Sequence, residues 1–232
     1  MKNDRRAGAD ISVVIPTLNE AENIGKLITY LNEQDKNLEI IVVDGGSTDG
    51  TVAAVQNRAK VLKSPRGRGR QMNIGARAAS GKWLWFLHAD CRPHPEAVSS
   101  LRKMMARNGV VGGAFEYRLD EPGWIFRMSE FFSNRKNRLL KLFYGDMGIF
   151  VRREVFEKMA GYQEIPLMED LDLCRRLKRE GDIVILPDPI ITSGRRWMEE
   201  GPVKNIVRNW LLQIAWLLGA SPKTLARWYK FH

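Results

Sequence analysis

The chain has 232 residues, and its hydrophobic fraction of 44% and charged fraction of 28% are those of an ordinary folded protein. This composition excludes a disordered or low-complexity chain, and two cysteines, Cys91 and Cys174, are too few for a disulfide framework. The formal net charge of +10 favours anionic partners, which include nucleic acid, acidic lipid head groups and phosphorylated small molecules.

The chain begins with MKNDRRAGAD, which lacks the apolar core of a signal peptide and therefore favours a cytoplasmic protein. The next stretch, ISVVIPTLNE, predicts a buried strand that ends near Pro16. A helix follows, because apolar residues recur at helical spacing: Ile24, Leu27, Ile28 and Leu31.

The same plan repeats twice more. LEIIVVDGGSTDGTVAAV predicts a strand that ends at Asp44 and a helix capped near Ser47 or Thr48. After the basic loop KSPRGRGRQ, a short helix is expected over 72–79 and a third strand over 82–88. Three strand and helix units in order predict a parallel sheet covered by helices.

The second half reads as mixed α/β structure. Beyond Pro93 we expect, in order, a helix over 94–107, a strand over 109–119, an amphipathic helix over 123–143, a strand and helix within 145–159, a helix over 169–181 and a short strand over 182–187. No linker rich in proline, glycine or serine separates the halves, so one domain over 1–232 is predicted.

The longest stretch without a charged residue near the C-terminus is NWLLQIAWLLGASP. It runs only from Asn209 to Pro222, which is shorter than the about 20 residues needed to cross a bilayer. Trp210, Trp216 and Trp228, with basic neighbours, suit a helix at a membrane surface, but a helix packed on the domain is the favoured reading.

Polar residues follow the predicted strands at Asn19, Asp44 and Asp90. In parallel sheets ligands bind beyond the carboxyl ends of the strands. Asp90 is a candidate ligand of a divalent cation, which often takes only one or two protein carboxylates, and a turn or cap is the alternative reading. Glu169 and Asp170 begin a helix, where they serve either as a general base or as acids favoured by the helix dipole.

Three other motifs are incomplete. The basic loop has Met72 where a dinucleotide fingerprint needs its third glycine, and DGGSTDG has Gly46 where a calcium loop needs a ligand. His88, Cys91 and His94 are spaced like zinc ligands, but no neighbouring residue completes a set.

Five segments, in order between Ile11 and Trp197, together resemble family 2 glycosyltransferases: VVIPTLNEAENI, VVDGGSTDGT, RGRGRQMNIGARAASGKWLWFLHAD, GDMGIFVRREVFEKMAGY and EDLDLCRRL. Within that family the chain looks closest to small bacterial enzymes with HAD where most members have two aspartates. The resemblance implies an α/β GT-A fold with a Rossmann-like, mainly parallel central sheet covered by helices. It also implies a nucleotide-sugar-binding half over about 11–92, an acceptor and catalytic half over about 93–197, and C-terminal helices over about 200–232.

The resemblance further implies a metal-dependent, inverting transfer of a sugar from a nucleoside diphosphate donor to an acceptor hydroxyl or lipid phosphate, with Mn²⁺ or Mg²⁺. Asp90 matches the metal ligand, and Asp170 matches the catalytic base, with Glu169 beside it. The positions matched to the donor are Pro16, Thr17, Asn19, Glu20, Asp44, Arg66, Arg70, Asn73, His88 and Ala89. The candidates for contacts to the diphosphate or the acceptor are Arg196, Trp197 and Asp146.

This sequence departs from the family at His88, where most members have an acid, and at SGRRW, where Ser193 replaces the first residue of the signature of processive polymer synthases. Nucleotidyl transfer and nucleotide-sugar hydrolysis are the alternative reactions, and product analysis separates them. A nucleic-acid-binding protein is the alternative of another class. The basic cluster from Lys60 to Arg77 holds no aromatic residue to stack on bases, so nucleic acid is not an expected partner.

The acceptor is not identified by the sequence. The segment WIFRMSEFFSNRKNRLLKLF mixes apolar and basic residues, which suits a lipid-linked acceptor at the inner face of a membrane as well as packing on the sheet.

Overall fold

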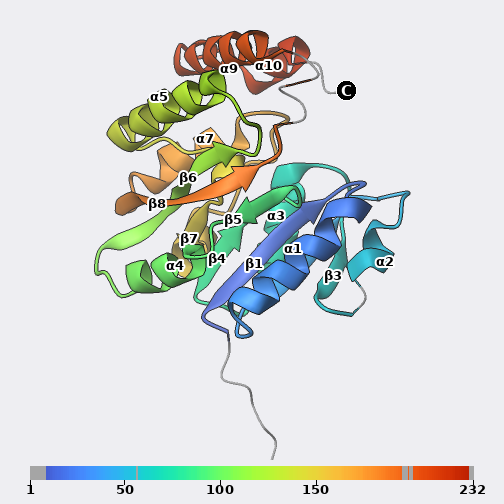
Figure 1. Cartoon of the computed structure of the whole chain (residues 1–232). Coiled ribbons are helices and arrows are strands. Elements are labelled where there is room, and N and C mark those ends of the chain that lie inside the picture. Colours follow the sequence, from blue (N-terminus) through green and yellow to red (C-terminus); the bar gives the residue numbers. More distant parts are fainter. Residues whose placement is uncertain (1–8, 56, 195–197, 199–200, 230–232) are drawn as a thin grey trace, which may run out of the picture.

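The computed structural model describes residues 9–55, 57–194, 198 and 201–229 (Figure 1). Within this part of the chain one eight-stranded sheet has the hydrogen-bonded order β3-β2-β1-β4-β7-β6-β8-β5. The strands are β1 (Ile11–Thr17), β2 (Glu39–Asp44), β3 (Lys60–Lys63), β4 (Trp83–Phe86), β5 (Cys91–Pro93), β6 (Val110–Leu119), β7 (Phe150–Arg152) and β8 (Asp182–Thr192). The helices are α1 (Ala21–Gln34), α2 (Thr51–Val55), α3 (Arg68–Arg77), α4 (Ala97–Met105), α5 (Trp124–Leu140), the 3-10 helix η1 (Gly145–Met147), α6 (Arg153–Lys158), α7 (Glu169–Leu177), α9 (Pro202–Leu217) and α10 (Pro222–Trp228).

The first half is the parallel, helix-covered sheet that the sequence predicts. β1 pairs in parallel with β2 on one side and with β4 on the other, and β3 extends the sheet beyond β2. Val13 and Ile15 belong to one buried cluster together with residues of α1 and α4, whereas Val14 belongs to a second cluster with residues of α3 and α7. Because successive strand residues point to opposite faces, an unbroken apolar strand indicates that both faces are covered.

The second half is mixed, as predicted. β7 runs antiparallel to both β4 and β6, β8 runs parallel to β6, and β5 closes the order antiparallel to β8. Only residues 87–90 separate β4 from β5 along the chain, yet β7, β6 and β8 stand between these two strands in the sheet. The sheet is therefore curled, and the short segment that carries His88 and Asp90 crosses its concave side.

Several predicted boundaries were wrong. β3 and β5 were not expected, α3 begins at Arg68 rather than Met72, β4 ends at Phe86 rather than His88, and α7 ends at Leu177 rather than Gly181. β8 continues to Thr192 instead of stopping at Pro187. Its partner strand β6 shifts register there, pairing Phe115 with Leu186 and Tyr117 with Ile190. Pro187 and Pro189 lie in the stretch between Leu186 and Ile190 where the register shifts. Because this stretch is irregular, their lack of a backbone N–H breaks no hydrogen bond of the sheet.

The C-terminal helices α9 and α10 lie at one end of the molecule next to α5 (Figure 1). They are attached to the start of α7 through a small apolar cluster formed by Leu167, Met168, Leu171, Leu212 and Leu225. The expected packing of the C-terminal segment on the domain is therefore confirmed for the face of α9 that bears Leu212. None of the helices in the described part of the chain is both long and apolar enough to cross a membrane.

Candidate functional site

A cavity of about 850 Å³ opens beyond the carboxyl ends of β1 and β4, where the sequence predicts a ligand site. On the side of the strand ends, five segments that are distant in sequence contribute charged or polar groups to its lining. They are the loop after β1 with Glu20, the loop after β4 with His88 and Asp90, the start of α3 with Arg68, and the η1 and α7 starts with Asp146 and Asp170.

Asp90 and Asp146 place two carboxylates in this cavity. Asp90 is exposed, whereas Asp146 Oδ1 is buried and accepts no hydrogen bond from a described residue. Burial, followed by the charges of Asp170 and Asp90, raises the pKa of Asp146 from 3.8 to about 7. The three acids therefore act on one another electrostatically, and the cavity attracts cations.

Asp170 is held in place by backbone donors. The N–H of Gly145 donates to Asp170 Oδ2 at 2.8 Å, and the N–H of Leu171 donates to Oδ1 at 2.8 Å. A carboxylate oxygen has two lone pairs, so both oxygens keep the capacity to accept a proton or a further hydrogen bond. Asp170 is thus an oriented carboxylate facing a cavity, which is the geometry that a general base needs.

Glu169, its neighbour, has a different environment. Its carboxylate is buried and forms an ion pair with Arg68, Oε1 to Nε at 3.0 Å. Burial raises the pKa of Glu169, the Arg68 guanidinium opposes this, and the charge of Asp170 adds to it. Of the two predicted catalytic acids, Asp170 lines the cavity and Glu169 instead anchors Arg68 there.

His88 lies against the backbone that orients Asp170. A Cβ at Gly145 would lie 2.8 Å from His88 Nε2, so a side chain there would require the imidazole to move. At the position where the resemblance implies an acid, this chain has an imidazole ring that lines the cavity and lies against the Gly145 segment.

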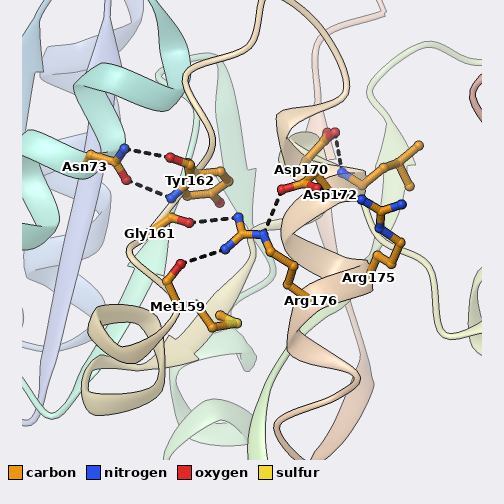
Figure 2. Close-up of polar contacts among 9 residues, drawn as sticks. Asn73, Met159, Gly161, Tyr162, Asp170, Asp172, Arg175 and Arg176 are labelled. Atoms are coloured by element: carbon orange, nitrogen blue, oxygen red, sulfur yellow. Dashed lines mark hydrogen bonds and ion pairs between the residues drawn. The ribbon is translucent and has the colours of Figure 1, made fainter. Parts of the chain in front are cut away.

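A second set of contacts fixes α7 relative to the rest of the fold (Figure 2). Arg176 Nε donates to Asp172 Oδ2 at 2.8 Å, and its terminal nitrogens donate to the carbonyls of Met159 and Gly161 at 3.0 and 2.8 Å. Asp172 also pairs with Arg175 at 3.2 Å and is not among the residues that line the cavity. These bonds hold the helix that begins with Glu169 and Asp170.

Asn73 continues this bracing towards α3. Its amide nitrogen donates to the carbonyl of Tyr162 at 2.9 Å, and its amide oxygen accepts from the N–H of Tyr162 at 2.8 Å (Figure 2). The side chain is buried and is not among the residues that line the cavity. The structure gives Asn73, predicted to border the donor, a supporting position behind the site.

The loops after β1 and β2 close on each other. Asn19, with a positive φ of 56°, donates from its N–H to Ser47 Oγ at 2.9 Å and accepts from the N–H of Thr48 at 2.9 Å. The buried Asp44 carboxylate accepts from the N–H groups of Gly46 and Ser47, both at 3.1 Å. Asp44 and Asn19 therefore shape this edge of the site, and among the loop residues Glu20 reaches the cavity.

The remaining predicted residues take varied positions. Pro16 and Thr17 are buried at the end of β1, Ala89 is buried between His88 and Asp90, and Arg66 is exposed. Arg70 is paired with Glu164 at 2.8 Å. Arg196 and Trp197 lie outside the described residues.

Sequence reasoning missed Arg68, which lines the cavity although Arg66 and Arg70 were singled out in its place. The start of α3 was the signal that could have identified Arg68. Residues two apart on a helix point in different directions, so Arg68 and Arg70 cannot face the same site. The prediction placed that start four residues too late, at Met72.

The chemistry of the cavity fits a divalent cation that takes few protein ligands. The described residues contain no group of three or more His, Cys, Asp or Glu side chains arranged to hold a metal ion. Asp90, exposed to the cavity beside the Asp146 carboxylate, offers a hard oxygen ligand in a negative environment. A cation bound there needs further oxygen ligands from a substrate.

The chain matches the sequence model of Glycosyl transferase family 2 over residues 12–160. It is 30% identical over 172 residues to glycosyltransferase AglE of Haloferax volcanii, covering 66% of this chain and 55% of that protein. It is 36% identical over 114 residues to dolichol-phosphate mannosyltransferase of Mycosarcoma maydis, covering 42% and 38%. The chain spans about half the length of such curated relatives.

Solved structures show the same fold. The mannosyltransferase PcManGT of Pyrobaculum calidifontis, in complex with GDP-Man and Mn²⁺, matches with a TM-score of 0.65 and 22% identity over 81% of this chain and 57% of that one. Glucosyl-3-phosphoglycerate synthase of Mycobacterium tuberculosis, in complex with Mn²⁺, UDP and glucosyl-3-phosphoglycerate, matches with a TM-score of 0.62 and 22% identity over 88% and 80%. The predicted GT-A architecture is confirmed.

Proposed function

The chain belongs to glycosyl transferase family 2, and from this premise we propose that it transfers a sugar from a nucleoside diphosphate donor to an acceptor. The observation that carries the proposal is the cavity lined by both Asp90 and Asp170, which come from opposite halves of the chain. Structural neighbours in complex with GDP-Man and with UDP support a nucleotide sugar as the donor class.

Asp90 is the residue that would hold Mn²⁺ or Mg²⁺ together with the donor diphosphate. When bound, the cation supplies neutralisation of the negative charge that develops on the departing diphosphate. Arg68 lines the same cavity and brings a second positive charge, oriented by its ion pair with Glu169. Structural neighbours solved in complex with Mn²⁺ support a divalent ion as the cofactor class.

Asp170 is the proposed general base. Its carboxylate, oriented by the N–H groups of Gly145 and Leu171, accepts the proton of the acceptor hydroxyl as that oxygen attacks the anomeric carbon. Glu169 holds Arg68, and Arg176 fixes the helix on which both acids lie. His88 packs on Gly145 and thereby maintains the peptide that orients Asp170.

The proposed transfer inverts the anomeric configuration. A direct displacement needs one base beside the attacking hydroxyl, which Asp170 supplies, whereas a double displacement needs a separate nucleophile under the anomeric carbon. Anomeric NMR of the product distinguishes the two courses.

The substitution Asp170→Asn tests this assignment. Asparagine keeps an oxygen to accept the N–H of Gly145, so the loop is expected to remain in place, but it cannot accept the proton. Transfer should fall about 100- to 10,000-fold, while affinity for the nucleoside diphosphate stays within about twofold. The matched control is Asp182→Asn, which removes an exposed carboxylate outside the cavity.

Mass spectrometry of the products separates the alternative reactions. A glycosylated acceptor formed together with intact nucleoside diphosphate supports sugar transfer. Free sugar without a glycosylated acceptor would assign a hydrolase, and release of pyrophosphate or nucleoside monophosphate would assign nucleotidyl chemistry. Near-normal transfer by Asp170→Asn would remove Asp170 from the role of base.

We further propose that the exposed apolar faces of α5 and α9 rest on a bilayer containing anionic lipids. On α9 the exposed apolar residues recur at helical spacing: Val203, Val207, Trp210, Leu211, Ile214 and Leu217. α5 exposes Trp124, Met128, Phe131 and Phe132. Exposed basic residues on or beside the same helices provide charge complementarity to anionic head groups: Arg135, Lys141, Lys204, Lys223 and Arg227.

Co-sedimentation with vesicles tests this surface. Binding should be stronger to phosphatidylcholine vesicles that contain phosphatidylglycerol than to phosphatidylcholine alone, and it should weaken with salt. The double substitution Phe131→Ser and Leu211→Ser should abolish it. Failure to sediment with either vesicle, or self-association that buries the face in solution, would refute the membrane proposal.

A further inference from the structure

One part of the cavity is lined by α5 and α9 rather than by strand ends. The groups there are hydroxyl, amide and cationic: Ser129, Ser133, Lys136, Arg208, Asn209 and Gln213. The acids Asp90, Asp146 and Asp170 line the part next to the strand ends and α7. The cavity is therefore electrically asymmetric, acidic at the proposed reaction centre and cationic between α5 and α9.

Lys136 bridges these two helices. Its ammonium donates to Gln213 Oε1 at 2.8 Å and lies 5.7 and 5.3 Å from the ring centroids of Tyr144 and Trp210. Burial lowers the pKa of Lys136, and no carboxylate of the described residues forms an ion pair with it. An ammonium has three N–H donors, and Lys136 uses one of them for Gln213. The neutral Gln213 amide and the two aromatic rings offset the cost of burying this charge less than an anion would.

Tyr144 connects this cation to the proposed base. Its hydroxyl is buried and forms no hydrogen bond with a described residue. Burial, followed by the charge of Asp170, raises the pKa of Tyr144, so the hydroxyl keeps its proton and can donate. The next residue, Gly145, is the one whose N–H holds Asp170, which places the cation and the base on either side of one short segment.

We propose that Lys136, Gln213 and the Tyr144 hydroxyl form a subsite for an anionic group of the acceptor, a phosphate or a carboxylate. The inference rests on the proposed function, because it assigns this part of the cavity to the acceptor of the transfer. The acidic residues repel the same group from the reaction centre, so the acceptor binds in one orientation, with its anion at Lys136.

Calorimetric titration with matched probes tests the subsite. The protein, saturated with UDP or GDP and Mn²⁺, is titrated with glycerol 3-phosphate against glycerol, and with geranyl phosphate against geraniol. The anionic member of at least one pair should bind about tenfold or more tightly than its neutral partner. Preference within the glycerol pair identifies a water-soluble acceptor, and preference within the geranyl pair identifies a lipid-linked one.

Three variants separate recognition from packing. Lys136→Met should weaken binding of the anionic probe about tenfold or more without changing the Kd of the nucleotide, and Lys136→Arg should restore most of it. Lys103→Met removes the same charge from the exposed face of α4 and should change neither. Melting temperatures of all variants show whether each is folded.

The outcomes are distinct from those of the proposed function. Tight nucleotide binding with no preference for either anionic probe overturns the acceptor subsite alone, as does full anion binding by Lys136→Met. Absence of nucleotide binding overturns the proposed function, and the same titrations without nucleotide then decide the anion subsite by the same criteria.

Discussion

The substitution Asp146→Asn is expected to remove a pH-dependent loss of stability. The pKa of Asp146 is raised from 3.8 in the unfolded chain to about 7 in the folded protein, by burial and by Asp170 and Asp90. Between these values the folded chain holds a proton that the unfolded chain has released. Stability therefore falls as the pH rises through this window, and the loss is complete above about pH 7.

The magnitude follows from the same interval. Each pH unit corresponds to about 1.4 kcal/mol, so the range from 3.8 to about 7 sets an upper limit of about 4 kcal/mol. Asparagine has a similar shape and no charge at any pH. The stability of the variant relative to wild type should therefore increase by about 2 to 3 kcal/mol between about pH 5 and about pH 8.

Urea unfolding at these two pH values, in the presence of a chelator, measures the effect. The control Asp182→Asn removes an exposed carboxylate and should keep the wild-type pH slope. The comparison of slopes remains informative even if the introduced amide changes the absolute stability. Equal slopes for wild type and Asp146→Asn would refute the raised pKa of Asp146.

Two further substitutions test how α7 is held. Arg176→Met leaves Asp172 with Arg175 alone and removes the hydrogen bonds to the carbonyls of Met159 and Gly161. The free energy of unfolding in urea should therefore fall by about 2 to 3 kcal/mol. Sugar transfer should also decrease, because α7 is less firmly held. An unchanged unfolding midpoint would show that this bracing is dispensable. Gly161→Ala forces alanine to a φ of +71° and brings its Cβ into steric conflict with Asn73 Oδ1, so it should cost at least about 1 to 2 kcal/mol by thermal unfolding. Gly50→Ala, whose Cβ would meet only Ala21 at 3.8 Å, is the control, and equal melting temperatures for the two alanine variants would contradict the close packing at Asn73.

The parallel half of the fold was predictable because its signals are local. Val13 to Ile15 and Ile40 to Val43 form unbroken apolar runs, followed by Pro16 near the end of the first strand and by a glycine-rich turn after the second. β3 and β5 were missed because short strands are defined by their partners. Lys60 to Lys63 places two apolar residues between lysines, a pattern that becomes a strand only at the edge that β2 offers.

The candidate site was predicted in part for a similar reason. Asp90 and Asp170 stand at element ends, which the sequence reveals, and the fold brings them to one cavity. The direction of side chains is a tertiary property. Arg70 meets Glu164 and Asn73 meets Tyr162 because the loop before α7 returns across α3, and no spacing in the sequence predicts that return.

Lys136 illustrates the same limit. On the sequence it is one cation in the basic stretch of a long amphipathic helix, indistinguishable from its neighbour Arg135. In the structure Arg135 is exposed, whereas Lys136 is half-buried between Tyr144 and Trp210. The packing of α9 on α5, which creates this environment, depends on contacts between distant parts of the chain.

The central claim is that this cavity binds a nucleoside diphosphate together with a divalent cation at Asp90. Its most direct test is the melting temperature of wild type and Asp90→Asn in a panel of nucleoside diphosphates, with and without Mn²⁺, because a ligand of the folded state raises that temperature. We predict that at least one nucleotide stabilises the wild type, more strongly with Mn²⁺, and that Asp90→Asn loses the metal-dependent part. No stabilisation by any nucleotide, or an identical metal-dependent rise in Asp90→Asn, would contradict the claim.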